Sequence, residues 1–171
     1  RSQVNEGSVF SFVLDYPKSE EERTTAKSFA KTSFGDGQLP NLTILLAEDN
    51  ELNQVVAEDT IKKWNEDIVM DIFENGELAV EAIKAFPDRY DLVLMDVQMP
   101  GIDGYQATQI IRQQFDAQQL PIFALTAHCE PADIARSLNS GMNKHLTKPV
   151  VAPILLASIA DLGISKPCFF D

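Results

Sequence analysis

The sequence predicts an α/β fold, with a doubly wound, five-stranded parallel sheet in the order 2-1-3-4-5 and five helices. Three observations lead to this prediction. Short apolar runs occur without polar alternation, which suits strands buried on both faces of a parallel sheet. These runs take turns with segments in which apolar residues recur about every 3.6 positions, as in amphipathic helices. Most runs end in polar residues, as strands do at the ligand-binding edge of such sheets.

The expected strands and helices alternate from residue 42 onward. The strands cover residues 42–47, 68–73, 92–96, 121–125 and 144–147. The helices cover residues 52–64, 78–86, 105–115, 132–139 and 151–162. Strand–helix–strand units join parallel strands by right-handed crossovers, so the helices should cover both faces of the sheet.

The segments around this region differ from it. An alternating run through Phe10, Phe12 and Leu14 ends at Pro17, which predicts one β-strand that needs a partner. This run resembles the closing strand of a histidine-kinase ATP-binding domain, and an unrelated N-terminal arm is the alternative. The next segment is rich in Ser, Thr, Lys and Glu, as flexible linkers are. We therefore expect a strand remnant (1–17), a linker (18–40), a main domain (41–163) and a tail (164–171).

Composition and charge narrow the classes of function. The formal net charge is -12, which argues against nucleic acid as a direct partner. No apolar run approaches the length of about 18 residues expected of a membrane span, so we expect no direct membrane contact from this chain. Cys129 and Cys168 lack the spacing of a disulfide framework, which fits a cytoplasmic location. A longer parent protein could still be anchored in a membrane.

Polar residues gather at the ends of the predicted strands. Glu48 and Asp49 follow the first strand, Asp96 ends the third, Thr126 follows the fourth and Lys148 follows the fifth. In the order 2-1-3-4-5 these four strands are neighbours, so one crevice would receive three carboxylates, a hydroxyl and an ammonium group. Taken alone, Asp96 could simply cap the turn that follows it. The polar residues at the ends of the other strands favour the interpretation that Asp96 belongs to a binding site.

The acids of this crevice need a cation. Three carboxylates that lie close together repel each other and raise each other's pKa unless a positive charge joins them. Ligands that are all oxygen suit Mg²⁺ better than zinc. A cation, a lysine and a hydroxyl donor together can receive phosphoryl oxygens, and a central carboxylate such as Asp96 can attack phosphorus.

Four blocks of sequence together resemble the receiver domain of two-component response regulators. They are residues 47–50, 95–104, 125–127 and 148–149, in the order of that family, and the resemblance covers about residues 42–162. It implies a flavodoxin-like fold, Mg²⁺ as the cofactor and a phosphohistidine of a histidine kinase as the donor. Asn53 looks like the last residue of the hybrid-kinase pattern Glu-Asp-Asn-x-x-Asn, although an ordinary residue in the first turn of a helix is an equal alternative.

The resemblance also implies a role for each site residue. Asp96 would be the phosphoacceptor, and Asp49 and Asp96 would bind Mg²⁺ directly. The main-chain carbonyl of Gln98 would be a further ligand, and Glu48 would act mostly through water. Lys148 would pair with the phosphoryl oxygens.

Three further positions bear on switching and on the lifetime of the phosphoryl group. Thr126 would bond a phosphoryl oxygen and draw its loop inward, and His145 would then turn inward at a position where the family commonly has Tyr or Phe. Gln98 and His128 occupy positions that tune dephosphorylation in the family. Alternatively, His145 is simply a half-exposed strand residue, and His128 is simply a solvated loop residue.

These residues lead to one main hypothesis about function. The chain would be the receiver domain of a hybrid sensor kinase, catalysing its own phosphorylation and autodephosphorylation and relaying the phosphoryl group to a histidine phosphotransfer protein. Alternatively, the receiver would act as a local brake on the kinase instead of relaying the phosphoryl group. The helix over residues 52–64 and the crevice loops would form the docking face, and a weak homodimer stays possible.

Two alternatives come from other classes of protein. A haloacid-dehalogenase-like phosphatase also uses Asp, Thr, Lys and acidic Mg²⁺ ligands, but its nucleophile follows the first strand in an Asp-x-Asp pair. Here Asp96 ends the third strand and Gln98 stands two residues later. A pseudo-receiver that only binds partners is disfavoured because the acidic, hydroxyl and lysine residues are all present.

Overall fold

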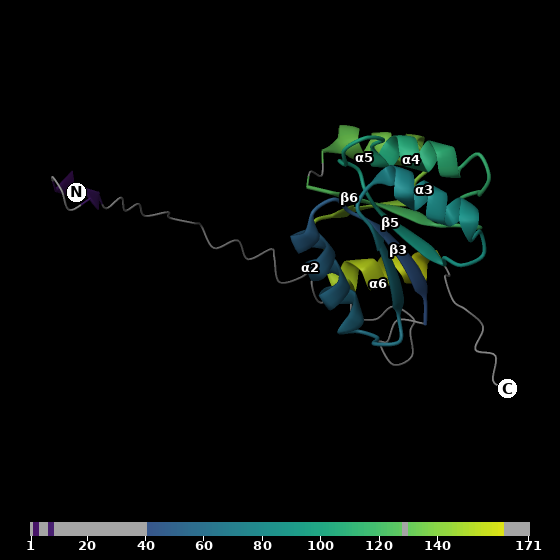
Figure 1. Ribbon diagram of the computed structural model, residues 1–171, viewed down its shortest axis with the longest axis horizontal. Helices are drawn as coiled ribbons and strands as arrows, with labels where there is room; N and C mark the ends of the chain where they lie inside the picture. Colours follow the sequence, from purple (N-terminus) through teal and green to yellow (C-terminus); the bar gives the residue numbers. More distant parts are fainter. Residues whose placement is uncertain (1, 4–6, 9–40, 128–129, 163–171) are drawn as a thin grey trace. The chain divides into compact units, whose positions relative to one another are not determined.

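The computed structural model describes residues 2–3, 7–8, 41–127 and 130–162 (Figure 1). The chain divides into two units, residues 1–30 and 31–171. In the first unit, β1 (Ser2–Gln3) pairs antiparallel with β2 (Gly7–Ser8). Of the strand expected before Pro17, only its start at Gly7 and Ser8 is described. The rest of that strand, the expected linker and the expected tail lie outside the described residues.

The second unit contains one parallel sheet and five helices in alternation. Its strands are β3 (Thr43–Ala47), β4 (Val69–Phe73), β5 (Leu92–Asp96), β6 (Ile122–Thr126) and β7 (Lys144–Thr147). Its helices are α2 (Glu51–Lys62), α3 (Gly76–Ala85), α4 (Gly104–Ile111), α5 (Pro131–Asn139) and α6 (Ala152–Asp161). The strands lie in the order β4-β3-β5-β6-β7. Counted from β3, this is 2-1-3-4-5, so the predicted flavodoxin-like fold is confirmed.

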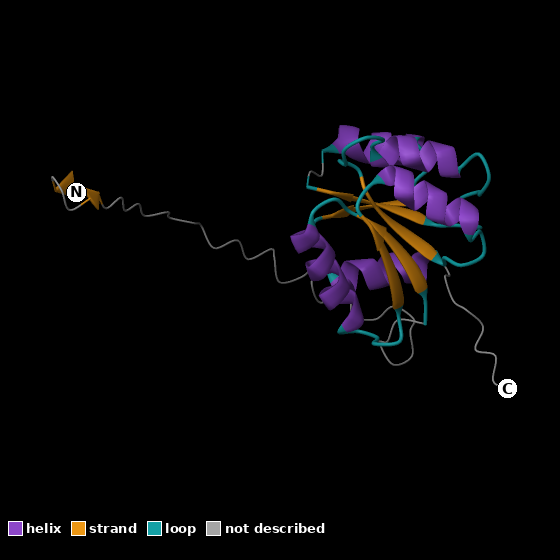
Figure 2. Ribbon diagram, viewed as in Figure 1, coloured by secondary structure: helices purple, strands orange, loops and turns teal. Residues whose placement is uncertain are grey.

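Successive residues of the central strands point into two separate cores. Leu45, Val93 and Met95 pack with residues of α3 and α4 on one face. Leu46 and Leu94 pack with residues of α2 and α6 on the other. Figure 2 shows the helices above and below the sheet. All five residues of β5 are buried, which explains why this strand reads as an unbroken apolar run.

Helix α4 is shorter than the sequence predicts. The expected helix runs to residue 115, whereas the observed one ends at Ile111. After Ile111 the main chain continues in turns, in which the N–H groups of Gln113 and Gln114 donate to the carbonyls of Ile110 and Ile111. The guanidinium of Arg112 donates to the carbonyls of Phe115 and Leu120 and so satisfies main-chain acceptors after the helix.

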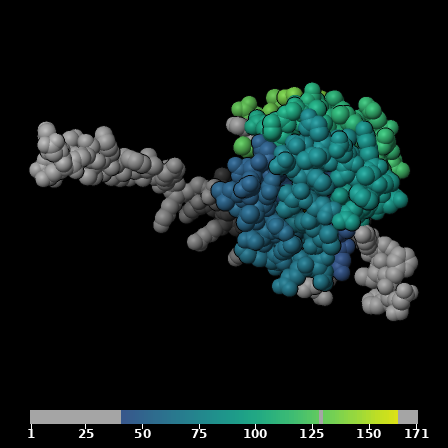
Figure 3. All heavy atoms as spheres, viewed as in Figure 1, coloured from purple at the N-terminus to yellow at the C-terminus, as the bar shows by residue number. Residues whose placement is uncertain are grey.

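Helix α2 turns most of its apolar residues outward. The 3.6-residue spacing that predicted this helix includes Leu52, Val55 and Val56, yet these side chains are 71%, 55% and 39% exposed. Only Ala57 and Ile61 of this helix are buried. In Figure 3 the atoms of α2, in blue, lie at the surface. The helix was predicted from its spacing, but that spacing does not mark its buried face.

None of the described helices combines the length and the apolar character that crossing a bilayer requires.

Candidate functional site

Three carboxylates meet at the carboxyl end of the sheet. Glu48 and Asp49 follow β3, and Asp96 is the last residue of β5, the strand that pairs with β3. One oxygen from each carboxylate lies within 4.8 Å of the others. Glu48 and Asp96 are 1% and 3% exposed, whereas Asp49 lies at the surface. The three carboxylates that the sequence places at the strand ends therefore lie together in the structure.

Lys148 joins two of these acids. Its Nζ atom lies 2.6 Å from Oε2 of Glu48 and 2.6 Å from Oδ2 of Asp96. The lysine reaches them from the end of β7, where its main-chain N–H donates to the carbonyl of Thr126 at 2.7 Å. One ammonium group thus faces two buried carboxylates, which leaves the site short of positive charge.

The surroundings of Asp96 shift the pKa of its carboxyl group. Burial raises the pKa of Asp96, while hydrogen bonds from Lys148 and from the main-chain N–H of Gln98 oppose this rise. The Gln98 N–H lies 3.0 Å from Oδ1 of Asp96. Burial has the largest effect, so the ionised form of Asp96 is held at a cost that a further cation would relieve.

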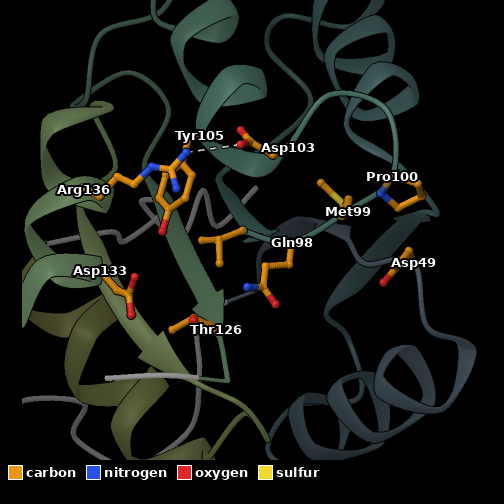
Figure 4. Close-up of a pocket in the computed structure, with 10 residues that line it drawn as sticks. Asp49, Gln98, Met99, Pro100, Asp103, Tyr105, Thr126, Asp133 and Arg136 are labelled. Carbon is orange, nitrogen blue, oxygen red and sulfur yellow. Dashed lines mark hydrogen bonds and ion pairs between the residues drawn. The ribbon is translucent and has the colours of Figure 1, made fainter. Parts of the chain in front are cut away.

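The cluster opens into a cavity of about 560 Å³. Asp49, Gln98 and Thr126 line it, and so do Asp133 and Arg136 of α5 (Figure 4). Thr126 ends β6 and is 3% exposed. The predicted acidic, hydroxyl and lysine residues therefore come together in one place.

The donor set fits Mg²⁺. Three carboxylates within one cluster supply hard oxygen ligands, and the adjoining cavity leaves room for water, which this ion retains. The main chain at Gln98 runs directly beside Asp96. These residues would therefore suit a hard divalent cation.

His145 lies on β7, three residues before Lys148. It is half-buried, and its Nδ1 lies 3.0 Å from the hydroxyl of Ser137 on α5. The other histidine of interest, His128, lies outside the described residues.

Two features of the site were missed or left open at the level of sequence. Arg136 lies 4.1 Å from the ring centroid of Tyr105 and 3.5 Å from Asp103, and so joins α5 to the loop after β5 (Figure 4). Asn53, left open between two interpretations, donates to Oε1 of Glu48 at 2.8 Å. Its place in the pattern Glu-Asp-Asn-x-x-Asn was the one signal that pointed to it.

Gly104 gives the end of β5 the space it needs. A Cβ atom at this first residue of α4 would overlap the main-chain carbonyl of Asp96. The helix can therefore approach the end of β5 closely only with glycine here.

Comparisons with known proteins identify the family of the domain. The family model for the response regulator receiver domain matches residues 44–160. The aerobic respiration control sensor protein ArcB of Escherichia coli strain K12 is 35% identical over 159 residues, which is 92% of this chain. The chain spans 19% of the length of ArcB.

Two solved structures resemble the domain. The receiver domain of the sensor histidine kinase PA1611 of Pseudomonas aeruginosa PAO1, with magnesium in its active-site cleft, shares 35% identity at a TM-score of 0.62. The match covers 72% of this chain and 98% of that one. The Saccharomyces cerevisiae complex of Ypd1 with the Ssk1 receiver domain matches with 30% identity and a TM-score of 0.64, over 76% and 95%. The chain therefore belongs to the response regulator receiver domain family.

Proposed function

We propose that the domain takes a phosphoryl group from a phosphohistidine onto Asp96 and relays it to a histidine phosphotransfer protein. The observation that carries this proposal is the bridge from Lys148 to Glu48 and Asp96, beside a cavity lined by Asp49 and Thr126. A carboxylate oxygen of Asp96 attacks phosphorus while the bond from phosphorus to the donor's imidazole nitrogen breaks. The imidazole leaves and later takes up a proton from solvent.

The chain's own residues prepare each part of this transfer. The Gln98 N–H holds one oxygen of Asp96, so the carboxylate is oriented before the donor arrives. Lys148 then pairs with the phosphoryl oxygens, and Thr126 bonds one of them. Bound Mg²⁺, held by Asp49, Asp96 and the Gln98 carbonyl, and by Glu48 through water, would neutralise the charge that gathers on the phosphoryl oxygens.

Switching and the lifetime of the phosphoryl group would depend on residues around Asp96. We assign the switch to Thr126 and His145, which lie on the adjacent strands β6 and β7. Gln98 lines the cavity beside the acids, and we assign it, with His128, to tuning of hydrolysis.

The wider context is also a proposal. ArcB is named as a sensor protein, and the PA1611 receiver comes from a sensor histidine kinase. The match to ArcB covers 92% of this chain, so it includes part of the sequence before residue 41. This supports a hybrid kinase in which residues 1–17 end the ATP-binding domain and residues 18–40 link it to the receiver, with the receiver in the cytoplasm.

The docking face for the phosphotransfer partner is the outer side of α2. Leu52 and Val55 expose apolar side chains beside the site, and Val56 lines a small cavity with Glu48 and Lys148. The Ssk1 receiver crystallised with the phosphotransfer protein Ypd1, which supports a partner of the same kind here. Leu52→Asp should weaken phosphotransfer at least about tenfold, the effect expected for a contact worth more than about 1.4 kcal/mol.

Leu138→Asp is the matched control, because Leu138 is 50% exposed on a different helix, α5. It should leave transfer unchanged. Equal loss in both variants would remove α2 from the docking face without touching the phosphoacceptor assignment.

Phosphorylation by a small acyl phosphate with Mg²⁺ tests the core proposal. The chain should gain one phosphoryl group that is stable in acid and released by hydroxylamine, as acyl phosphates are. Asp96→Asn should abolish this labelling. Labelling that persists in Asp96→Asn would move the phosphoacceptor elsewhere, and a wild-type chain that takes no label would be a pseudo-receiver.

A further inference from the structure

We propose that Asn53 is a positioning residue for Mg²⁺, acting through the carboxylate of Glu48. The inference rests on the proposed function, since it concerns the metal that serves phosphoryl transfer there. It assigns a role to a side chain on α2 that lies outside the three-carboxylate cluster.

Both oxygens of Glu48 are engaged. Nδ2 of Asn53 donates to Oε1 at 2.8 Å, and Nζ of Lys148 lies 2.6 Å from Oε2. The glutamate has one more rotatable bond than an aspartate, so its carboxylate needs more than one partner to hold a single orientation. Asn53 fixes the oxygen that Lys148 leaves free.

Asn53 is itself held in place. Oδ1 of Asn50, the N-cap residue of α2, accepts the main-chain N–H of Leu52 at 3.0 Å and that of Asn53 at 3.2 Å. The first turn of α2 therefore presents the Asn53 amide to Glu48 from a fixed backbone. Pre-organisation of this kind lowers the entropy lost when a metal ion and its water bind.

The neighbouring Gln54 contacts the main chain of Glu48, whereas Asn53 contacts its carboxylate. Its Nε2 atom donates to the main-chain carbonyl of Glu48 at 2.7 Å. Gln54 thus ties the backbone of Glu48 to α2, whereas Asn53 orients the carboxylate. The two amides stand side by side on one helix turn, which makes Gln54 a matched control for Asn53.

The chemistry of Asn53 suits a cation site. Its amide donates a hydrogen bond without adding positive charge, so it orients Glu48 without competing electrostatically with Mg²⁺. A lysine at this position would neutralise the acid that the metal needs. Groups that orient metal ligands through hydrogen bonds typically change metal affinity by about 10- to 100-fold. Because Glu48 would act on Mg²⁺ mostly through water, we expect the lower end of that range.

Calorimetric titration of the full chain with Mg²⁺, without any phosphodonor, tests the inference. Asn53→Ala should raise the dissociation constant for Mg²⁺ about tenfold. Gln54→Ala should keep it within about twofold. In a Glu48→Ala background, Asn53→Ala should have no further effect, because the carboxylate on which it acts is gone.

Phosphorylation by acyl phosphate gives a second readout. In Asn53→Ala the Mg²⁺ concentration for half-maximal rate should rise about tenfold, while the rate at saturating Mg²⁺ stays at the wild-type value. A general structural defect would also lower the rate at saturating Mg²⁺.

Three results would overturn the inference: a wild-type dissociation constant in Asn53→Ala, an equal loss in Gln54→Ala, or additive losses in the double variant with Glu48→Ala. A wild-type chain that does not bind Mg²⁺ at all would instead overturn the proposed function itself. The two failures are therefore distinguishable.

Discussion

The Nδ1 atom of His145 lies 3.0 Å from the hydroxyl oxygen of Ser137. The same hydroxyl donates to the main-chain carbonyl of Asp133 at 3.0 Å. A serine hydroxyl has one hydrogen, so when Ser137 donates it to Asp133 it can only accept from the His145 ring. From this arrangement we expect the neutral ring to carry its proton on Nδ1, and the contact joins β7 to α5.

This bond predicts the tautomer of His145. In alkaline solution, long-range ¹H–¹⁵N NMR should show a protonated Nδ1 in the wild-type chain. Ser137→Ala removes the acceptor and should shift the neutral ring toward the Nε2–H form. Ser140→Ala, which removes another buried hydroxyl of this region, should leave the tautomer unchanged. A wild-type ring without a proton on Nδ1 would refute the assignment.

Asp96→Asn should make the metal-free chain more stable, by about 1 kcal/mol, a usual size for a single stabilising change. Two buried acids share one lysine, and burial raises the pKa of Asp96. Ionised Asp96 therefore lowers the free energy of unfolding at pH values above its pKa in the folded state. This cost disappears as the pH falls below the unfolded value of 3.8.

Urea denaturation at neutral pH and near pH 4 measures this difference. The gain from Asp96→Asn should be present at neutral pH and fade in acid. Asp67→Asn replaces an exposed carboxylate and should change little at either pH. A variant less stable than wild type at neutral pH would contradict the account.

Lys148→Ala should destabilise the metal-free chain by about 3 kcal/mol, because it leaves Glu48 and Asp96 buried without their counter-ion. Added Mg²⁺ should recover much of this loss, since binding to the folded state stabilises it by mass action. Thermal unfolding with and without Mg²⁺ measures both effects. Lys144→Ala, which breaks an exposed pair with Asp161, should cost less than about 1 kcal/mol.

Lys148→Ala should also separate phosphorylation from switching. Mg²⁺ binding should stay largely intact, but amide chemical shifts near His145 should no longer respond to phosphorylation as in wild type. Unaltered shift changes in this variant would show that the lysine does not couple the two.

Gly104→Ala should destabilise the chain by about 2 kcal/mol and slow phosphorylation, because the added methyl group overlaps the Asp96 carbonyl. The end of β5 or the start of α4 would have to move, and either shift displaces Asp96. Chemical denaturation and the initial labelling rate are the measurements. An unchanged labelling rate would show that the packing at Gly104 does not position Asp96.

Much of the fold follows from local sequence. The strands are buried on both faces, so Leu92 to Met95 form an apolar run that no helix period explains. The topology of such a sheet then brings Asp49, Asp96, Thr126 and Lys148 to one edge. For these reasons the sequence alone predicts that these four side chains lie together.

The features that the sequence does not predict depend on where side chains point between helices and strands that are distant in the chain. Arg112 donates to carbonyls of the turns after α4 and to the Gly141 carbonyl, and no local pattern encodes these contacts. Arg136 reaches Tyr105 from another helix, and their positions are 31 apart in the chain. The exposure of Leu52 likewise depends on how α2 rotates against the sheet, which spacing alone does not define.

The buried and exposed sides of α2 have different contacts, and this difference bears on how receiver domains diversify. Ala57 and Ile61 hold the helix against the sheet, while Leu52 and Val55 face solvent. Substitutions on the outer side should therefore leave folding intact. If the outer side is the docking face proposed above, exchanging its residues between two receivers should change the phosphotransfer partner without changing the chemistry at Asp96.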